Sequence, residues 1–264
     1  MADRALCVGI NDYPIRGMKL RGCRNDARAW ARTLVRHYDV AQGDVAMLLD
    51  GDATKRKIVN GLRRLVRGAA KGDRLVFTNS SHGTYVADDD GDEARYDEAL
   101  CPYDCGDRVI VDDDLREILD GIPTGVRFTF ISDSCHSGNV TRAAPWQHPN
   151  RRARFADPTM MGRSASVAVA RREARKRQRR SESSMKELLV SGCLDSEFAY
   201  DDKFGRRYHG AMTFHALRSL EHAGWKIRYE DWIADINARL ENDMFFQHPQ
   251  LEGPSSAKRR WVFS

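Results

Sequence analysis

Short apolar runs alternate with amphipathic stretches through the first half of the chain, and this alternation restricts the fold more than any other feature. Residues 54–67 repeat apolar side chains every three and four positions, which is the period of one helical face. Residues 6–10 form a continuous apolar run, as expected of a parallel strand buried on both faces. The order predicts an open, mostly parallel α/β sheet covered on both sides. The expected strands are residues 6–10, 45–49, 75–77, 128–131, 188–190 and 260–263, and the expected helices are 26–37, 54–67, 114–122, 211–223 and 229–240.

Length and composition set the domain organisation. The 264 residues contain 41% hydrophobic and 31% charged residues, which excludes a wholly disordered or fibrous chain. We expect a larger portion at 1–138, a mobile Arg-rich linker at 139–185 that cannot pack by itself, and a smaller portion at 186–264 that completes the same sheet. No apolar run approaches the roughly 18–20 residues of a membrane span. Six cysteines without a visible export signal indicate reduced thiols and a cytoplasmic location.

Two oppositely charged segments dominate the electrostatics. Residues 88–114 hold 12 acidic residues and 2 arginines, a net charge of −10. Residues 142–186 hold 13 Lys and Arg against 3 acidic residues, a net charge of +10. The Arg-rich part of this second segment suits nucleic acid by charge alone, but it lacks interleaved aromatic residues and a surrounding nucleic-acid fold. Nucleic acid is therefore not the expected partner.

A histidine and a cysteine each follow a predicted strand. His82 comes just after residues 75–77, and Cys135 comes just after residues 128–131. Reactive groups collect beyond the C-terminal ends of parallel strands, so the two side chains are expected to face each other as a thiol–imidazole pair. The backbone N–H groups of Gly83 and Cys135 are candidates to hold a developing oxyanion. The alternative for each residue taken alone is a small buried thiol or a structural histidine.

These motifs, with several others, give the chain a resemblance to the caspase-like cysteine peptidases, specifically the metacaspases and their bacterial relatives, the orthocaspases. The resemblance runs nearly the whole length, through the segments 8–13, 20–27, 80–84, 96–100, 112–115, 133–138, 195–200 and 210–214. It implies a caspase-like α/β/α sandwich with a mostly parallel central sheet. It also implies that Cys135 is the nucleophile and that His82, not the adjacent His136, is its partner.

Charge indicates what the cleft selects. Asp133 lies two residues before the nucleophile, and Asp26 opens the first predicted helix, so both carboxylates are expected to flank one cleft. Such a pair favours a guanidinium or ammonium group. The resemblance assigns Asp26, Asp133 and Ser80 to the pocket for Arg or Lys at P1, the residue on the N-terminal side of the scissile bond. For Asp26, capping of its helix is the alternative.

The resemblance also implies that a set of three aspartates, here called the calcium set, binds an activating Ca²⁺, an ion that prefers oxygen ligands. The calcium set is Asp97, Asp112 and Asp113. A further acidic ligand of the family falls at Arg142, so the sequence leaves calcium dependence open. The chemistry itself needs no cofactor.

The predicted function is that of a monomeric cysteine endopeptidase that cleaves proteins or peptides after Arg or Lys and that cuts its own linker. The alternative is a binding or signalling module of caspase-like fold whose basic segment recruits nucleic acid or an acidic partner. The expected self-cleavage sites are Arg171, Arg172, Arg175, Lys176, Arg177, Arg179 and Arg180.

Overall fold

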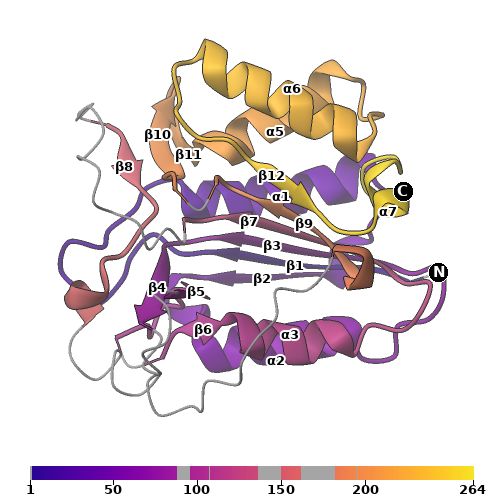
Figure 1. Ribbon diagram of the computed structural model, residues 1–264, viewed down its shortest axis with the longest axis horizontal. Coiled ribbons are helices and arrows are strands. Elements are labelled where there is room, and N and C mark those ends of the chain that lie inside the picture. Colours follow the sequence, from indigo (N-terminus) through magenta and orange to yellow (C-terminus); the bar gives the residue numbers. More distant parts are fainter. Residues whose placement is uncertain (1, 88–95, 107, 136–149, 162–181, 195) are drawn as a thin grey trace.

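The computed structural model describes residues 2–87, 96–106, 108–135, 150–161, 182–194 and 196–264. Its centre is a six-stranded sheet in the order β12-β9-β7-β3-β1-β2 (Figure 1). Within this sheet, β2, β1, β3, β7 and β9 pair in parallel with their neighbours, and β12 is antiparallel to β9. The strands are β1 (Asp3–Gly9), β2 (Val45–Leu49), β3 (Arg74–Ser80), β7 (Arg127–Asp133), β9 (Glu187–Ser191) and β12 (Gln250–Glu252).

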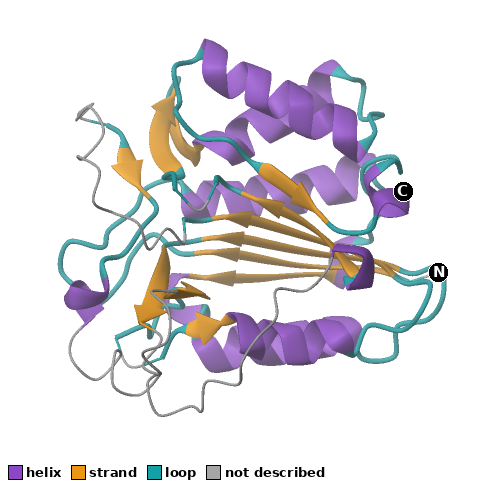
Figure 2. Ribbon diagram, in the orientation of Figure 1, coloured by secondary structure: helices purple, strands orange, loops and turns teal. Residues whose placement is uncertain are grey.

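Helices cover both faces of this sheet (Figure 2). Side chains alternate along β1, so that Ala5 and Cys7 pack in one hydrophobic core while Leu6 and Val8 pack in the other. The first core holds residues of α1 (Cys23–His37), α5 (Ala211–His222) and α6 (Tyr229–Asn242), and the second holds residues of α2 (Lys55–Val66) and α3 (Asp112–Asp120). The predicted α/β sandwich with a mostly parallel sheet is therefore confirmed.

Two small sheets lie beyond the C-terminal ends of the parallel strands (Figure 1). One consists of β4 (Gly83–Ala87), β5 (Tyr96–Leu100) and β6 (Ile110–Val111), and the other of β8 (Arg152–Ala153), β10 (Tyr200–Phe204) and β11 (Arg207–Gly210). They stand at the edge where ligands of parallel sheets collect. The remaining elements are α7 (Ser255–Lys258) and short 3₁₀ helices at Gln42–Asp44, Asp50–Asp52, Pro158–Met161 and Glu182–Ser184.

The strand predicted at residues 260–263 is wrong. Trp261 forms only an isolated bridge with Arg228, and Phe263 has a φ of 52°, which no extended strand tolerates. Val262 and Phe263 are apolar because they fill the core below α6. The edge strand next to β9 is instead β12, which has three residues.

Part of the predicted linker packs against the rest of the molecule. Arg154 and Ala156 are fully buried, and Arg152 and Ala153 pair with β10. Residues 150–161 have no core of their own and are instead ordered by their contacts with the rest of the molecule. The seven predicted self-cleavage sites between Arg171 and Arg180 lie outside the described residues. Among the helices described, none is long and apolar enough to cross a membrane.

Candidate active site

His82 and Cys135 follow neighbouring strands. Ser80 at the end of β3 is in register with Asp133 at the end of β7, so the chain leaves both strands at the same edge of the sheet. Both His82 and Cys135 are buried, with 4% and 0% of their surfaces exposed. The backbone N–H of Gly83, next to His82, and the N–H of Cys135 donate to one common carbonyl oxygen. The backbone next to His82 and the backbone of Cys135 therefore meet at one carbonyl group.

The surroundings of His82 fix its protonation and its tautomer. Burial lowers the pKa of His82 to about 4, and the hydrogen bond to Met18 opposes this only in part, so the imidazole is neutral near pH 7. Nε2 lies 2.8 Å from the carbonyl oxygen of Met18. Since a carbonyl can only accept, the proton is on Nε2 and Nδ1 carries the lone pair. Nδ1 is buried and makes no regular hydrogen bond to a described residue, although the Arg154 backbone lies close enough to raise the pKa of His82, and it is the nitrogen left for the predicted role as base.

The thiol of Cys135 is held by the smaller portion of the chain. Its Sγ donates to the carbonyl oxygen of Glu197 over 2.8 Å. Cys193 lies against it, and the contact with Cys135 together with burial raises the pKa of the Cys193 thiol. In its predicted role as nucleophile, Cys135 would first have to break this hydrogen bond.

Arg154 presents its carbonyl to the predicted oxyanion hole. Its carbonyl oxygen accepts hydrogen bonds from the N–H of Gly83 over 2.9 Å and from the N–H of Cys135 over 3.2 Å. On one side, the N–H of Arg154 donates to the carbonyl of Ala199. On the other side, the N–H of Ala156 donates to the carbonyl of Gly83. The segment therefore lies as an extended peptide between Gly83 and Ala199, with the Arg154 carbonyl at the predicted oxyanion hole.

The guanidinium of Arg154 enters a pocket of three carboxylates. Its Nη2 lies 2.6 Å from Asp26 Oδ2 and 3.0 Å from Asp201 Oδ1, and its Nη1 lies 3.2 Å from Asp133 Oδ2. The side chains of Arg154, Asp26 and Asp201 are 0% exposed, and that of Asp133 is 1% exposed. The predicted pair Asp26 and Asp133 thus faces one bound cation. Asp26 lies in the first turn of α1, which begins at Cys23, and so does not cap the helix.

The three carboxylates around the Arg154 guanidinium differ in the direction in which their pKa values are shifted. Burial alone would raise the pKa of Asp26, but Arg154 and a 2.8 Å contact with His209 outweigh it, and the pKa is lowered. Burial raises the pKa of Asp133 and of Asp201, and Arg154 offsets this only in part. Burial would lower the pKa of Arg154, but the carboxylates outweigh it and raise that pKa far above its usual value. The pocket therefore holds a permanent cation in an excess of negative groups.

Several parts of this pocket were not predicted from the sequence. Asp201 accepts from the backbone N–H groups of Arg21 and Gly22, which aims its carboxylate at Arg154. Thr213 donates both its N–H and its hydroxyl to Asp133 Oδ2. Gly210 leaves room for the guanidinium, since a Cβ at this position would overlap Asp133 Oδ2 and Arg154 Nη1. Gly210 and Thr213 lie in the segment 210–214 that carries the resemblance, but the sequence assigned them no role, and nothing in it marks Asp201 except its place in the predicted smaller portion.

Ser80, the third predicted pocket residue, is buried at the end of β3 beside Asp133. The polar contacts of Arg154 with the described residues do not include the Ser80 hydroxyl. Its role in the pocket stays a prediction.

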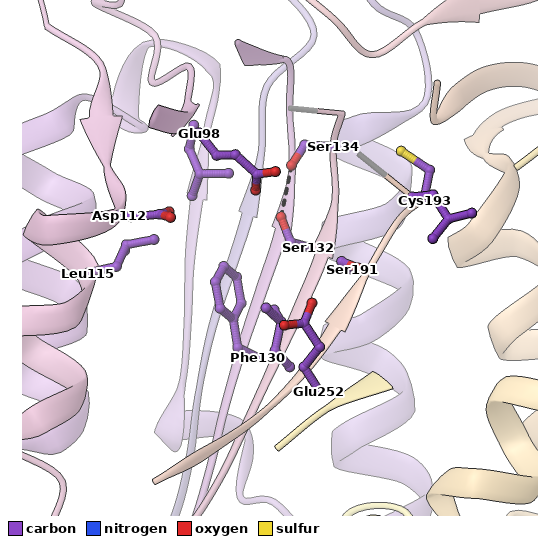
Figure 3. A pocket seen from close by; sticks show the side chains of 12 residues that line it. Glu98, Asp112, Leu115, Phe130, Ser132, Ser134, Ser191, Cys193 and Glu252 are labelled. Carbon is purple, nitrogen blue, oxygen red and sulfur yellow. Dashed lines mark hydrogen bonds between the residues drawn. The ribbon is translucent and has the colours of Figure 1, made fainter. Parts of the chain in front are cut away.

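The calcium set is only partly described. Asp112 points into a pocket that Glu98, Ser132 and Ser134 also line (Figure 3). Asp113 lies 3.7 Å from Arg116, and the side chain of Asp97 is outside the description. Within the described residues, no three acidic, histidine or cysteine side chains are arranged to hold a metal. The described side chains alone therefore do not make a calcium site, and Arg142 lies outside them.

Two solved structures share this fold. Caspase-1 from Spodoptera frugiperda matches with a TM-score of 0.58 at 11% identity, over 96% of this chain and 86% of that one. A crystal structure of a protein from Geobacter sulfurreducens matches with a TM-score of 0.78 at 26% identity, over 100% of this chain and 99% of that one. The fold is that of the caspases.

Sequence relatives narrow the class to a family. A model of the metacaspase, peptidase C14 domain matches residues 3–143. Metacaspase-1 from Pyricularia oryzae is 30% identical over 94% of this chain and 70% of its own length. Metacaspase-4 from Arabidopsis thaliana is 39% identical over 56% of this chain and 36% of its own length. This chain belongs to the metacaspase family of cysteine peptidases, although it spans only 36–41% of the length of four plant members.

Proposed function

We propose that this protein is a cysteine endopeptidase that cleaves peptide bonds after Arg or Lys, with Cys135 as nucleophile and His82 as base. One observation carries the proposal: Arg154 places its guanidinium among Asp26, Asp133 and Asp201 while its carbonyl oxygen accepts from two N–H groups, one of them that of Cys135. A substrate with Arg at P1 would bind in the same way. Lysine offers a single charged nitrogen to the same carboxylates, so arginine should be preferred.

The proposed chemistry begins with proton transfer. Nδ1 of His82 takes the proton from the Cys135 thiol, and the sulfur attacks the carbonyl carbon at P1. The N–H groups of Gly83 and Cys135 stabilise the resulting oxyanion. His82 returns the proton to the leaving amine as the C–N bond breaks, leaving a thioester. Water then gives a proton to His82 and attacks the thioester, which releases the acid and restores the thiol.

The protein is proposed to cut itself. Residues 150–156 already lie in the cleft, and a tethered segment is present at high effective concentration. The contacts of Arg154 make the Arg154–Phe155 bond the first substrate, and the predicted sites from Arg171 to Arg180 follow as later ones. Both fragments should stay together, because β7 from the first and β9 from the second pair in one sheet.

The proposed setting is the cytoplasm, with the enzyme acting as a monomer on protein substrates. All six cysteines are buried and none forms a disulfide with another described residue, which suits a reducing compartment.

Gel electrophoresis and peptide cleavage test the proposal. Purified wild type should yield fragments of 154 and 110 residues, and N-terminal sequencing of the shorter one should begin at Phe155. Cys135→Ala should stay intact, and His82→Ala should cut at least a thousandfold more slowly, since nucleophile and base act as a unit. Fluorogenic peptides with Arg or Lys at P1 should be cleaved and the matched Asp peptide should not.

Two results would contradict the proposal. Preference for Asp at P1 would refute the role of the acidic pocket. A folded wild type that cuts neither itself nor any Arg peptide would instead favour a caspase-fold binding module, and binding of nucleic acid by its basic segment would then be measured.

A further inference from the structure

A second arginine of the bound segment has a site of its own. Arg151 lies three residues before Arg154, and its Nε donates to Asp202 Oδ2 over 3.0 Å. Its guanidinium carbon lies 4.0 Å from the centre of the Phe245 ring and 5.5 Å from that of Tyr200. Its Nη1 also donates to the carbonyl oxygen of Met244 over 3.3 Å. The Arg151 guanidinium is thus contacted by a carboxylate, two aromatic rings and a backbone carbonyl.

Strand pairing separates this site from the P1 pocket. Ala153 is opposite Tyr200 and Arg152 is opposite Asp201 in the antiparallel pair of β8 and β10. Successive side chains point to opposite faces of a strand. Asp201 therefore faces Arg154, whereas Tyr200 and Asp202, one residue to each side of it, face Arg151. Two neighbouring aspartates of one strand serve two different arginines of the same peptide.

Asp202 is prepared to receive a cation. Its side chain is 8% exposed, and that of Arg151 is 20% exposed, so little water screens the pair. The N–H of Lys203 donates to Asp202 Oδ1 over 2.7 Å, which fixes the carboxylate and leaves Oδ2 for the guanidinium. The flat guanidinium can donate in its own plane and stack against a ring, which an ammonium group cannot do as well.

We propose that Asp202, Tyr200 and Phe245 form a second cation-binding subsite, which selects arginine at P4, the position three residues before P1. This inference rests on the proposed peptidase function and extends its specificity from one arginine to the pattern Arg-x-x-Arg. The chain's own residues 151–154, with the sequence Arg-Arg-Ala-Arg, are the first ligand of this pattern.

Peptide amides test the subsite without the tether. The probes are the coumarin amides of acetyl-Arg-Arg-Ala-Arg and acetyl-Ala-Arg-Ala-Arg, which differ only at P4. After self-cleavage, wild type should show a kcat/KM about tenfold higher for the first peptide, as a charge-assisted hydrogen bond with ring stacking implies. In Asp202→Asn this ratio should fall to near one, and in Phe245→Leu it should fall in part.

A charge reversal and a matched control complete the test. Asp202→Lys should prefer Glu over Arg at P4, which a merely structural role of Asp202 does not predict. Asp231→Asn, which removes an exposed carboxylate of α6, should keep the wild-type ratio. Equal kcat/KM for the two peptides in wild type, or an unchanged ratio in Asp202→Asn, would overturn the subsite alone. Failure of wild type to cut either peptide would overturn the peptidase function as well.

Discussion

The substitution Arg154→Gln tests how much the ion cluster of Arg154 with Asp26, Asp133 and Asp201 contributes to the stability of the fold, independently of catalysis. The change removes the guanidinium that contacts three carboxylates, each of which is at most 1% exposed. Removing one partner of a buried ion pair costs about 3–5 kcal/mol, because the remaining charges are left without compensation. For a domain of this size each kcal/mol lowers Tm by roughly 2–4 °C, so the expected loss is on the order of 10 °C. Thermal unfolding in a Cys135→Ala background, which keeps the chain intact, measures it.

The pH dependence of that loss separates the cluster from a general packing defect. The pKa values of Asp133 and Asp201 are already raised by burial, and loss of the cation raises them further. A carboxyl group whose pKa is higher in the folded than in the unfolded state stabilises the fold at low pH, and this stabilisation is lost as pH rises through the folded pKa. The deficit of Arg154→Gln should therefore be smaller at pH 5 than at pH 8.

Arg152→Gln is the matched control, since it removes the same charge two residues away. Arg152 donates to the carbonyl of Lys19 and touches none of the three carboxylates, so its replacement should cost less than about 1 kcal/mol. Equal losses for the two variants, or a deficit of Arg154→Gln that does not change with pH, would refute the reasoning.

Three further predictions concern activity. Gly210→Ala should lower kcat/KM for Arg peptides at least a hundredfold, because its Cβ would fill the pocket and overlap the position of the guanidinium. Gly43→Ala, which meets no atom within 4 Å, is the control, and undiminished cleavage by Gly210→Ala would contradict the pocket. Lowering the pH from 7 to 5 should raise KM more than it lowers kcat, because protonation of Asp133 and Asp201 weakens cation binding. His82, with a pKa of about 4, stays neutral over this range. In steady-state kinetics, a fall in kcat at constant KM would contradict this prediction. If the calcium set binds its ion, a chelator should slow self-cleavage and millimolar calcium restore it, whereas equal rates under both conditions would remove calcium from the mechanism.

The sequence predicted the sheet because buried parallel strands are marked locally. Continuous apolar runs identified the strands around Val8, Phe77 and Phe130, and the helical period identified α2. The small sheets were missed because their strands have two to five residues, too few to show a period. The false strand at residues 260–263 arose from the same limit, since apolar residues of a buried turn look like those of a strand.

The candidate site was predictable where its residues belong to strand ends. The positions of the strands pointed to His82, Cys135 and Asp133, and the start of a helix pointed to Asp26. Arg154 and Asp201 were not predictable, because their roles come from contacts between residues 128 and 47 positions apart in the chain. Such pairings depend on the folded cleft, and the charge of residues 142–186 in bulk gives no sign of which arginine enters it.

A purely structural interpretation of the Arg154 cluster meets two difficulties. Buried ion pairs seldom stabilise a fold more than apolar residues of the same volume, because removing charges from water costs as much as their attraction returns. A cluster with three carboxylates for one guanidinium is worse in this respect than a balanced pair, and the raised pKa values of Asp133 and Asp201 express that cost. In addition, a structural tie would require only the side chain, whereas the Arg154 carbonyl also meets the N–H groups of Gly83 and Cys135. The excess of negative charge is better suited to a pocket whose cation is exchanged: if the chain is cut after Arg154 as proposed and this arginine leaves, the carboxylates lose its guanidinium, and the next arginine to enter the pocket meets the same three groups and the same two donors.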